Sequence, residues 1–165
     1  MKLTTVLLAA FLATAVPSES ATSITFEGVP DKTPVGDYYN GGAGGSLGVS
    51  FNKRFQAIVT ADAGGTVAAI SGGSGSSAII NIPAGFEASL SLLYSGPGNT
   101  VVLFDRPDAK GTQLSQTTLG PTAPNSGLSP VTIRFTGRAR SILFGFVGFG
   151  TRKTVVDNLE FGATR

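Results

Sequence analysis

The sequence predicts an all-β domain, because apolar residues recur with a period of two and turn signals separate the segments that carry them. In residues 86–95 the apolar side chains fall on alternate positions: Phe86, Ala88, Leu90, Leu92 and Tyr94. This alternation is typical of a strand that buries one face. Outside the first 21 residues no window shows a sustained 3.6-residue apolar spacing. Many short strands joined by regular turns favour a sandwich or a barrel.

Eleven strands are expected on this basis, with turn signals rich in glycine, proline, asparagine and aspartate between them, as at 95–99, 106–111, 120–121 and 124–127. In chain order they are Ser23–Glu27, Gly48–Phe51, Phe55–Thr60, Thr66–Ile70, Ala78–Ile82, Phe86–Ser95, Thr100–Asp105, Thr112–Leu119, Val131–Thr136, Ser141–Phe146 and Thr154–Phe161. Two glycine-rich stretches, 40–46 and 71–77, lack the residues of a phosphate loop or a calcium-binding repeat. We therefore expect both stretches to be flexible surface loops.

The composition excludes several function classes. The chain has 165 residues, with no His, no Cys and no Trp. A Ser-His-Asp hydrolase, a zinc site built on His or Cys, and a disulfide framework are therefore ruled out. The formal net charge is only +2, and the basic residues are not interleaved with stacking aromatics, so no nucleic-acid partner is expected. The basic pairs at 53–54 and 152–153 are interpreted as a solvated face.

Residues 1–21 have the features of a secretory signal peptide. Lys2 precedes an apolar run from Leu3 to Val16, and small residues follow that suit cleavage between Ala15 and Ala21. The alternative is a buried N-terminal helix. No second apolar run approaches the length of about 18–20 residues needed to span a bilayer. We expect residues 22–165 to form one β-sandwich domain that is secreted, extracellular or periplasmic, with no membrane attachment after cleavage.

One carboxylate in the last expected strand is unusual. Strict alternation places Asp157 on the apolar face together with Val155, Leu159 and Phe161. A buried carboxylate is very costly unless it is neutralised, paired or bound to a metal. The alternatives for Asp157 are a turn cap or a pairing with arginine.

Three groups of segments, taken together, carry a resemblance to a known family. They are 24–30, 34–39 and 47–51 near the mature start; 88–94 and 101–105 in the middle; and 141–145 and 155–162 at the end. The chain resembles the secreted bacterial β-sandwich proteins that often carry a PEP-CTERM sorting tail. Their domains are similar to galactose-binding-like jelly rolls and carbohydrate-binding modules. The resemblance implies an all-β, antiparallel jelly-roll β-sandwich. The sequence ends at Arg165 without a Pro-Glu-Pro motif or an apolar tail, so this member is expected to be released.

The same resemblance implies a structural calcium ion where the first and last strands meet. Glu27 and Asp157 match the early glutamate and the late aspartate of that site. Calcium takes about six to eight oxygen ligands, so backbone carbonyls and Asp31 are needed to complete the shell. Because Glu27 alternates away from Phe26, it has to act from a strand end.

The function implied is non-catalytic binding of a glycan or exopolysaccharide. Such modules usually present aromatic rings to sugars, and Asp37, Tyr38, Tyr39 and Asn40 form the candidate ligand-binding edge, whereas Tyr94 is expected in the core. The alternative is a structural or adhesive component of the extracellular matrix or cell surface, without a small ligand. A glycosidase is disfavoured, since no local signature marks a catalytic carboxylate pair. The sequence does not specify the glycan or the oligomeric state.

Overall fold

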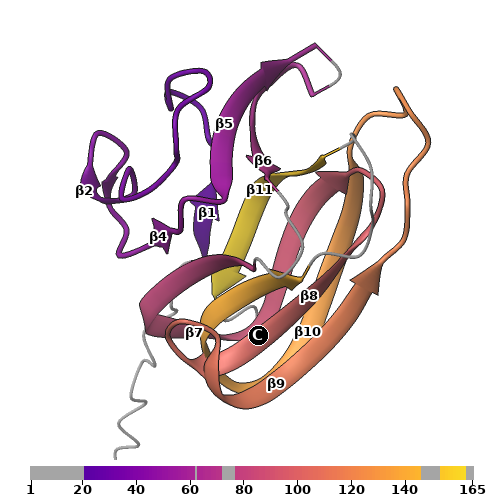
Figure 1. Ribbon diagram of the computed structural model, residues 1–165. Helices are drawn as coiled ribbons and strands as arrows, with labels where there is room; N and C mark the ends of the chain where they lie inside the picture. The colour runs from indigo at the N-terminus through magenta and orange to yellow at the C-terminus, as the bar shows by residue number, and fades with distance from the viewer. Residues whose placement is uncertain (1–20, 62, 72–76, 146–152, 163–165) are drawn as a thin grey trace, which may run out of the picture.

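The computed structural model describes residues 21–61, 63–71, 77–145 and 153–162, and every regular element in these ranges is a strand (Figure 1). The predicted signal peptide lies almost entirely outside the described residues. The strands are β1 (Thr22–Ile24), β2 (Asn40–Gly42), β3 (Gly45–Ser46), β4 (Ser50–Phe51), β5 (Phe55–Thr60), β6 (Gly65–Ile70), β7 (Ala78–Ser95), β8 (Asn99–Arg106), β9 (Lys110–Leu119), β10 (Ser129–Gly145) and β11 (Thr154–Gly162). Among the described residues no helix is long and apolar enough to cross a membrane.

Two long strands, β7 and β10, are shared by both layers of the molecule. The second half of β7 pairs with β11 and with the first half of β10, and β11 continues to β6 and β5, with β1 beside it. The first half of β7 pairs with β4 and with the second half of β10, which continues to β8 and β9. All these pairings are antiparallel. The result is a sandwich whose two sheets exchange strands through β7 and β10 (Figure 1).

The bends that carry β7 and β10 from one sheet to the other contain residues with positive φ. Gly85 and Ala88 have φ of 80° and 70°, and Gly137 has φ of 92°. The register between the strands shifts at the same places. A Cβ on Gly85 would lie 3.1 Å from the carbonyl oxygen of Ala139, so the close approach of the bends also requires glycine. The prediction of two separate strands in each of these segments was therefore wrong, because the chain bends without leaving the sheet.

The core lies between the two sheets and is dominated by phenylalanine and aliphatic residues. Phe26, Phe51, Phe55 and Phe144 form a chain of edge-to-face ring contacts with centroid distances of 5.6, 5.2 and 5.8 Å. Fully burying one such side chain contributes roughly 1.5–3 kcal/mol. Tyr94 is partly buried against this core, as predicted.

A β-bulge in β11 changes the face on which its residues lie. Asn158 has φ of 47°, and the register with β7 shifts between Asp157 and Glu160. The residues of β11 that enter the core are therefore Val156, Leu159 and Phe161. Strict alternation had placed Val155 and Asp157 on that face, and this prediction was wrong because the bulge adds one residue to the strand.

The glycine-rich stretch at 40–46 is more ordered than expected. It forms the short hairpin of β2 and β3, in which Asn40 pairs with Ser46 and Gly42 with Gly45. The flexible loop predicted there was wrong. Most of the second glycine-rich stretch, residues 72–76, lies outside the described residues.

Candidate functional site

Glu27 and Asp157 meet at a gap along one edge of β11. Residues 154–156 of β11 pair with β6, and residues 159–161 pair with β1. Asp157 lies between these two partners. Glu27 follows β1 and reaches the start of β6, where its Oε1 accepts a hydrogen bond of 3.0 Å from the backbone N–H of Thr66. The structure thus brings the two predicted metal ligands to the junction of the first and last strands.

Asp157 is 9% exposed, and its Oδ1 accepts a hydrogen bond of 2.8 Å from the backbone N–H of Asn158. Burial raises the pKa of Asp157, the hydrogen bond opposes this rise, and the charge of Glu27 adds to it. None of the ion pairs found in the described ranges includes Asp157, so the expected alternative of an arginine partner is not seen there. The site therefore favours a cation or a proton.

Asp31 is engaged away from this pair. Its Oδ1 accepts a hydrogen bond of 3.0 Å from the backbone N–H of Val59, and its Oδ2 lies 3.7 Å from Lys32 Nζ. Within the residues that the structure describes, no cluster of three or more acidic side chains is arranged to hold a metal. Any further oxygen ligands at the junction have to come from backbone carbonyls, hydroxyls or water.

Tyr39 is a core residue rather than a surface platform. Its side chain is 6% exposed, and its ring lies 6.3 Å from Phe26 and 6.2 Å from Phe51 between centroids. Burial, with smaller contributions from Tyr38, Asp157 and Glu27, raises the pKa of Tyr39 to about 12, and the backbone of Phe26 opposes this rise. No described side chain forms a hydrogen bond with its hydroxyl, and the backbone of Phe26 lies near it. The prediction that Tyr39 offers its ring to a sugar was therefore wrong, because the ring completes the aromatic core beneath the carboxylates.

The remaining residues of the predicted ligand edge stay near the surface. Asp37 and Asn40 are exposed, and the Asn40 amide donates a hydrogen bond of 3.2 Å to Asp37 Oδ1. Tyr38 is half-buried, with its ring edge-on to Tyr39 at 4.9 Å. A Cβ on Gly44 would collide with the Tyr38 ring, so the hairpin folds directly onto this tyrosine. The edge thus presents two polar side chains and one partly covered ring.

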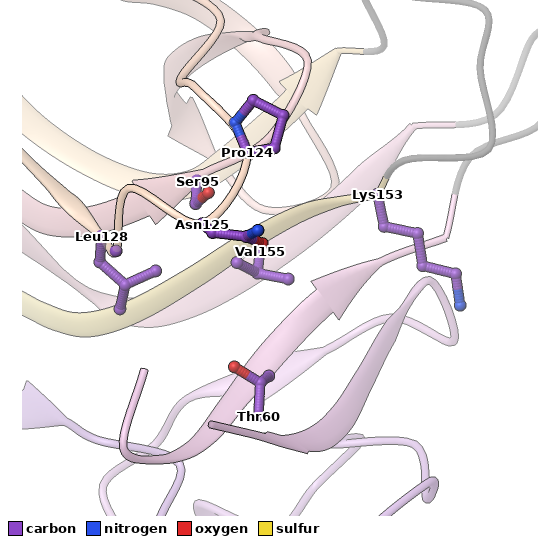
Figure 2. Close-up of a pocket in the computed structure, with 8 residues that line it drawn as sticks. Thr60, Ser95, Pro124, Asn125, Leu128, Lys153 and Val155 are labelled. Atoms are coloured by element: carbon purple, nitrogen blue, oxygen red, sulfur yellow. The ribbon is translucent and has the colours of Figure 1, made fainter. Parts of the chain in front are cut away.

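A hollow of about 200 Å³ opens on the sheet that contains β5, β6 and β11 (Figure 2). The sequence did not indicate it. Its lining combines hydroxyl, amide, ammonium and aliphatic groups: Thr60, Ser95, Pro124, Asn125, Gly127, Leu128, Lys153 and Val155. In Figure 2 Val155 lies between Pro124 on one side and Thr60 on the other. The loop that carries Pro124 is anchored at its start, because the Thr122 N–H donates to Gly96 O at 2.9 Å.

Comparison with known proteins identifies the fold. No protein-family model and no curated protein sequence matches the chain. Among solved structures, the K2 cleaved adhesin domain of Lys-gingipain aligns with a TM-score of 0.59 and 12% identity, over 87% of this chain and 100% of that one. A family 29 carbohydrate-binding module from Piromyces equi aligns with a TM-score of 0.56 and 6% identity, over 88% and 91%. Another family 29 module gives 0.54 and 13%, over 88% and 89%. The predicted fold class, an antiparallel jelly-roll β-sandwich, is confirmed.

Proposed function

We propose that this chain is a secreted, non-catalytic carbohydrate-binding module. The observation that carries the proposal is the fold likeness to family 29 carbohydrate-binding modules, which extends over 87–88% of the chain. Two of the similar structures are described as complexes with cellulohexaose and mannohexaose, at TM-scores of 0.54 and 0.52. The mixed polar and aliphatic lining of the hollow in Figure 2 suits a sugar, which offers both hydroxyls and apolar C–H faces.

Binding without cleavage agrees with the position of the carboxylates. A glycosidase needs two carboxyl groups about 5–10 Å apart in an open cleft. Among the described residues, the two carboxylates that meet at the strand junction are those of Glu27 and Asp157. The Asp157 side chain is only 9% exposed. A side chain so buried is poorly placed to reach a glycosidic oxygen.

A structural calcium ion at the junction is part of the proposal. Glu27 and Asp157 would hold it, and Tyr39 would place a hydroxyl at the same site. The donors fit a hard cation, since two carboxylates adjoin and the buried hydroxyl has no side-chain partner among the described residues. The ion would neutralise the two carboxylates and tie β1 to β11, so its contribution would be to stability. Secretion through residues 1–21 is also proposed, and N-terminal sequencing of the protein from culture medium tests it.

The direct test is a glycan array with the protein, run once in calcium and once in EDTA. A saturable signal for a neutral oligosaccharide is the expected result. A folded protein that binds no glycan in either condition contradicts the proposal. A signal that persists in EDTA leaves the glycan-binding function intact and limits calcium to stability.

A second candidate function is adhesion. The specific observation is the likeness to an adhesin domain, of which 100% is covered. Sedimentation distinguishes the two candidates when it is combined with the array. Ordered oligomers without a glycan signal favour a building block of an extracellular matrix, whereas a monomer with a glycan signal favours the module.

A further inference from the structure

Three neighbouring strands, β11, β7 and β10, present a surface that faces away from the core. The core side of β7 carries Leu90 and Leu92, so the residues between and beyond them point outward. Cross-strand pairing arranges the outward residues in four rows: Val155 with Ser95; Leu93 with Pro130, next to the buried Asp157; Glu160 with Ser91 and Thr132; and Gly162 with Ser89 and Arg134. Successive rows are two residues apart, so the four rows extend about 20 Å along the strands.

Three hollows follow these rows in sequence. The first, shown in Figure 2, contains the row of Ser95 and Val155. The second has a volume of about 220 Å³ and is lined by residues of the next two rows, among them Leu93, Pro130 and Thr132. The third is lined by the β7 and β11 residues of the last two rows. The second and third hollows share Ser91 and Glu160. The second and third hollows therefore adjoin, and the first lies at the next row along β7. We call the four rows together with the three hollows the track.

We infer that this track is the binding site for an extended, neutral polysaccharide chain, an inference that rests on the proposed function. Hydroxyl and amide groups alternate along it with aliphatic surface. Ser91 Oγ and Thr132 Oγ1 lie 2.9 Å apart and form a polar pair at its centre, next to Leu93 and Pro130. Hydroxyls can both donate and accept hydrogen bonds, as sugar hydroxyls do, and the aliphatic groups can pack on the C–H faces of the rings.

The same surface is poorly suited to an extended peptide. A peptide that adds to a sheet needs an open strand edge with unpaired backbone groups. β7 lies between β11 and β10 and pairs with both, so its backbone groups are already used. Recognition here depends on side chains. The charges near the track are of both signs, with Lys153 and Arg134 toward its ends and Glu160 and the buried Asp157 between them, so it does not select a polyanion.

The test is calorimetric titration of the protein with mannohexaose and cellohexaose. Thr132 is exposed, so Thr132→Arg blocks the centre of the track without disturbing the core. The matched control is Thr118→Arg, because Thr118 is an exposed threonine on β9 in the other sheet. We expect Thr132→Arg to weaken binding by about tenfold or more, and Thr118→Arg to leave it within about twofold. Thermal melts of both variants check that the fold is retained.

Amide chemical-shift mapping provides an independent measurement on the unmodified protein. The inference predicts perturbations centred on Ser91, Leu93 and Thr132. Binding that survives Thr132→Arg, with perturbations at residues 37–40 instead, overturns the inference but leaves the proposed function in place. If the wild-type protein binds neither hexaose, no soluble mannan and no glycan of the array, the proposed function fails, and the inference fails with it.

Discussion

Glu27, just beyond the first strand, lies close enough to Asp157, in the last strand, for its charge to raise the pKa of the buried aspartate. β1 and β11 pair along three residues, and the contact beside that pairing joins two groups of the same charge. In the absence of a cation it opposes folding, and with a cation it holds β1 and β11 together. The stability of the protein and its dependence on pH should therefore differ between the metal-free and the metal-bound form.

Replacing Asp157 with asparagine should stabilise the metal-free protein at neutral pH. The folded-state pKa of Asp157 lies above its ordinary value of 3.8, so the native state binds this proton more tightly than the unfolded chain does. The contribution of this group to stability therefore falls as pH rises from 3.8 through the raised pKa, and the full penalty applies above that range. We expect Asp157→Asn to add on the order of 1 kcal/mol in EDTA at pH 7.

Urea unfolding of the wild type and Asp157→Asn in EDTA, at several pH values, measures this difference. The advantage of the variant should shrink as the pH is lowered toward 3.8, where the carboxyl group is protonated. A variant that is less stable than the wild type at pH 7 in EDTA would show that the charged carboxylate is satisfied in the native state.

Calcium should reverse the order of the two proteins. If the ion binds only the folded wild type, a concentration 100 times the Kd adds about 2.7 kcal/mol of stability. Asp157→Asn should gain little. Asp31→Asn is the matched control, because Asp31 is held by Val59 and Lys32, and it should keep the full response. Melting curves with calcium, magnesium and EDTA provide the measurement, and equal responses of the wild type and Asp157→Asn would rule out a site at this junction.

Tyr39→Phe isolates the buried hydroxyl. Since no described side chain forms a hydrogen bond with it and the Phe26 backbone is its neighbouring polar group, removing the hydroxyl should change the metal-free stability by no more than about 1 kcal/mol. The ring contacts with Phe26 and Phe51 are retained. Chemical denaturation in EDTA tests this expectation. A loss of more than about 1 kcal/mol would mean that the hydroxyl has a strong partner, such as a buried water.

Gly96→Ala should destabilise the protein through a backbone clash. Gly96 has φ of 147°, and a Cβ there would lie 2.7 Å from Thr154 Cα and 2.9 Å from Lys153 O. Because backbone atoms cannot rotate away, a loss of roughly 1–3 kcal/mol is expected. Gly120→Ala is the control, since a Cβ at Gly120 meets nothing within 4 Å, and its effect should stay within about 0.5 kcal/mol. Similar melting temperatures for the two variants would contradict the close packing of β7 against β11.

The strands could be predicted from the sequence where the apolar alternation and the turn residues that bound it lie within one short segment. Phe55–Thr60 was predicted with its observed bounds as β5, because alternation and flanking turns define both ends. β7 was predicted as two strands, since Pro83 and Gly85 are typical of a break. Whether such residues end a strand or bend it depends on its neighbours, and here pairing with β4 and β10 continues the sheet through the bend.

The candidate site was predicted in part. Asp157 was predicted to be buried because strict alternation placed it on the core face. Asp157 is indeed buried, but the bulge at Asn158 takes its side chain off the core face, and the burial occurs at the strand junction instead. Tyr39 was assigned to a ligand because sequence cannot tell which of two adjacent rings enters the core. The track along β7 had no sequence signal, because its rows combine residues from three distant segments whose register only the folded sheet defines.

The antiparallel pairing of β1 with β11 has a mechanical consequence. Thr22 pairs with Phe161, so the two ends of the described chain leave the sheet at the same place (Figure 1). A force that pulls these ends apart acts across the strand pair and opens its hydrogen bonds one after another, as in a zipper. Strands loaded lengthwise would resist with all their bonds at once. We therefore expect the first yielding step under tension to need little force and to release β1, along with the Glu27 side of the carboxylate junction.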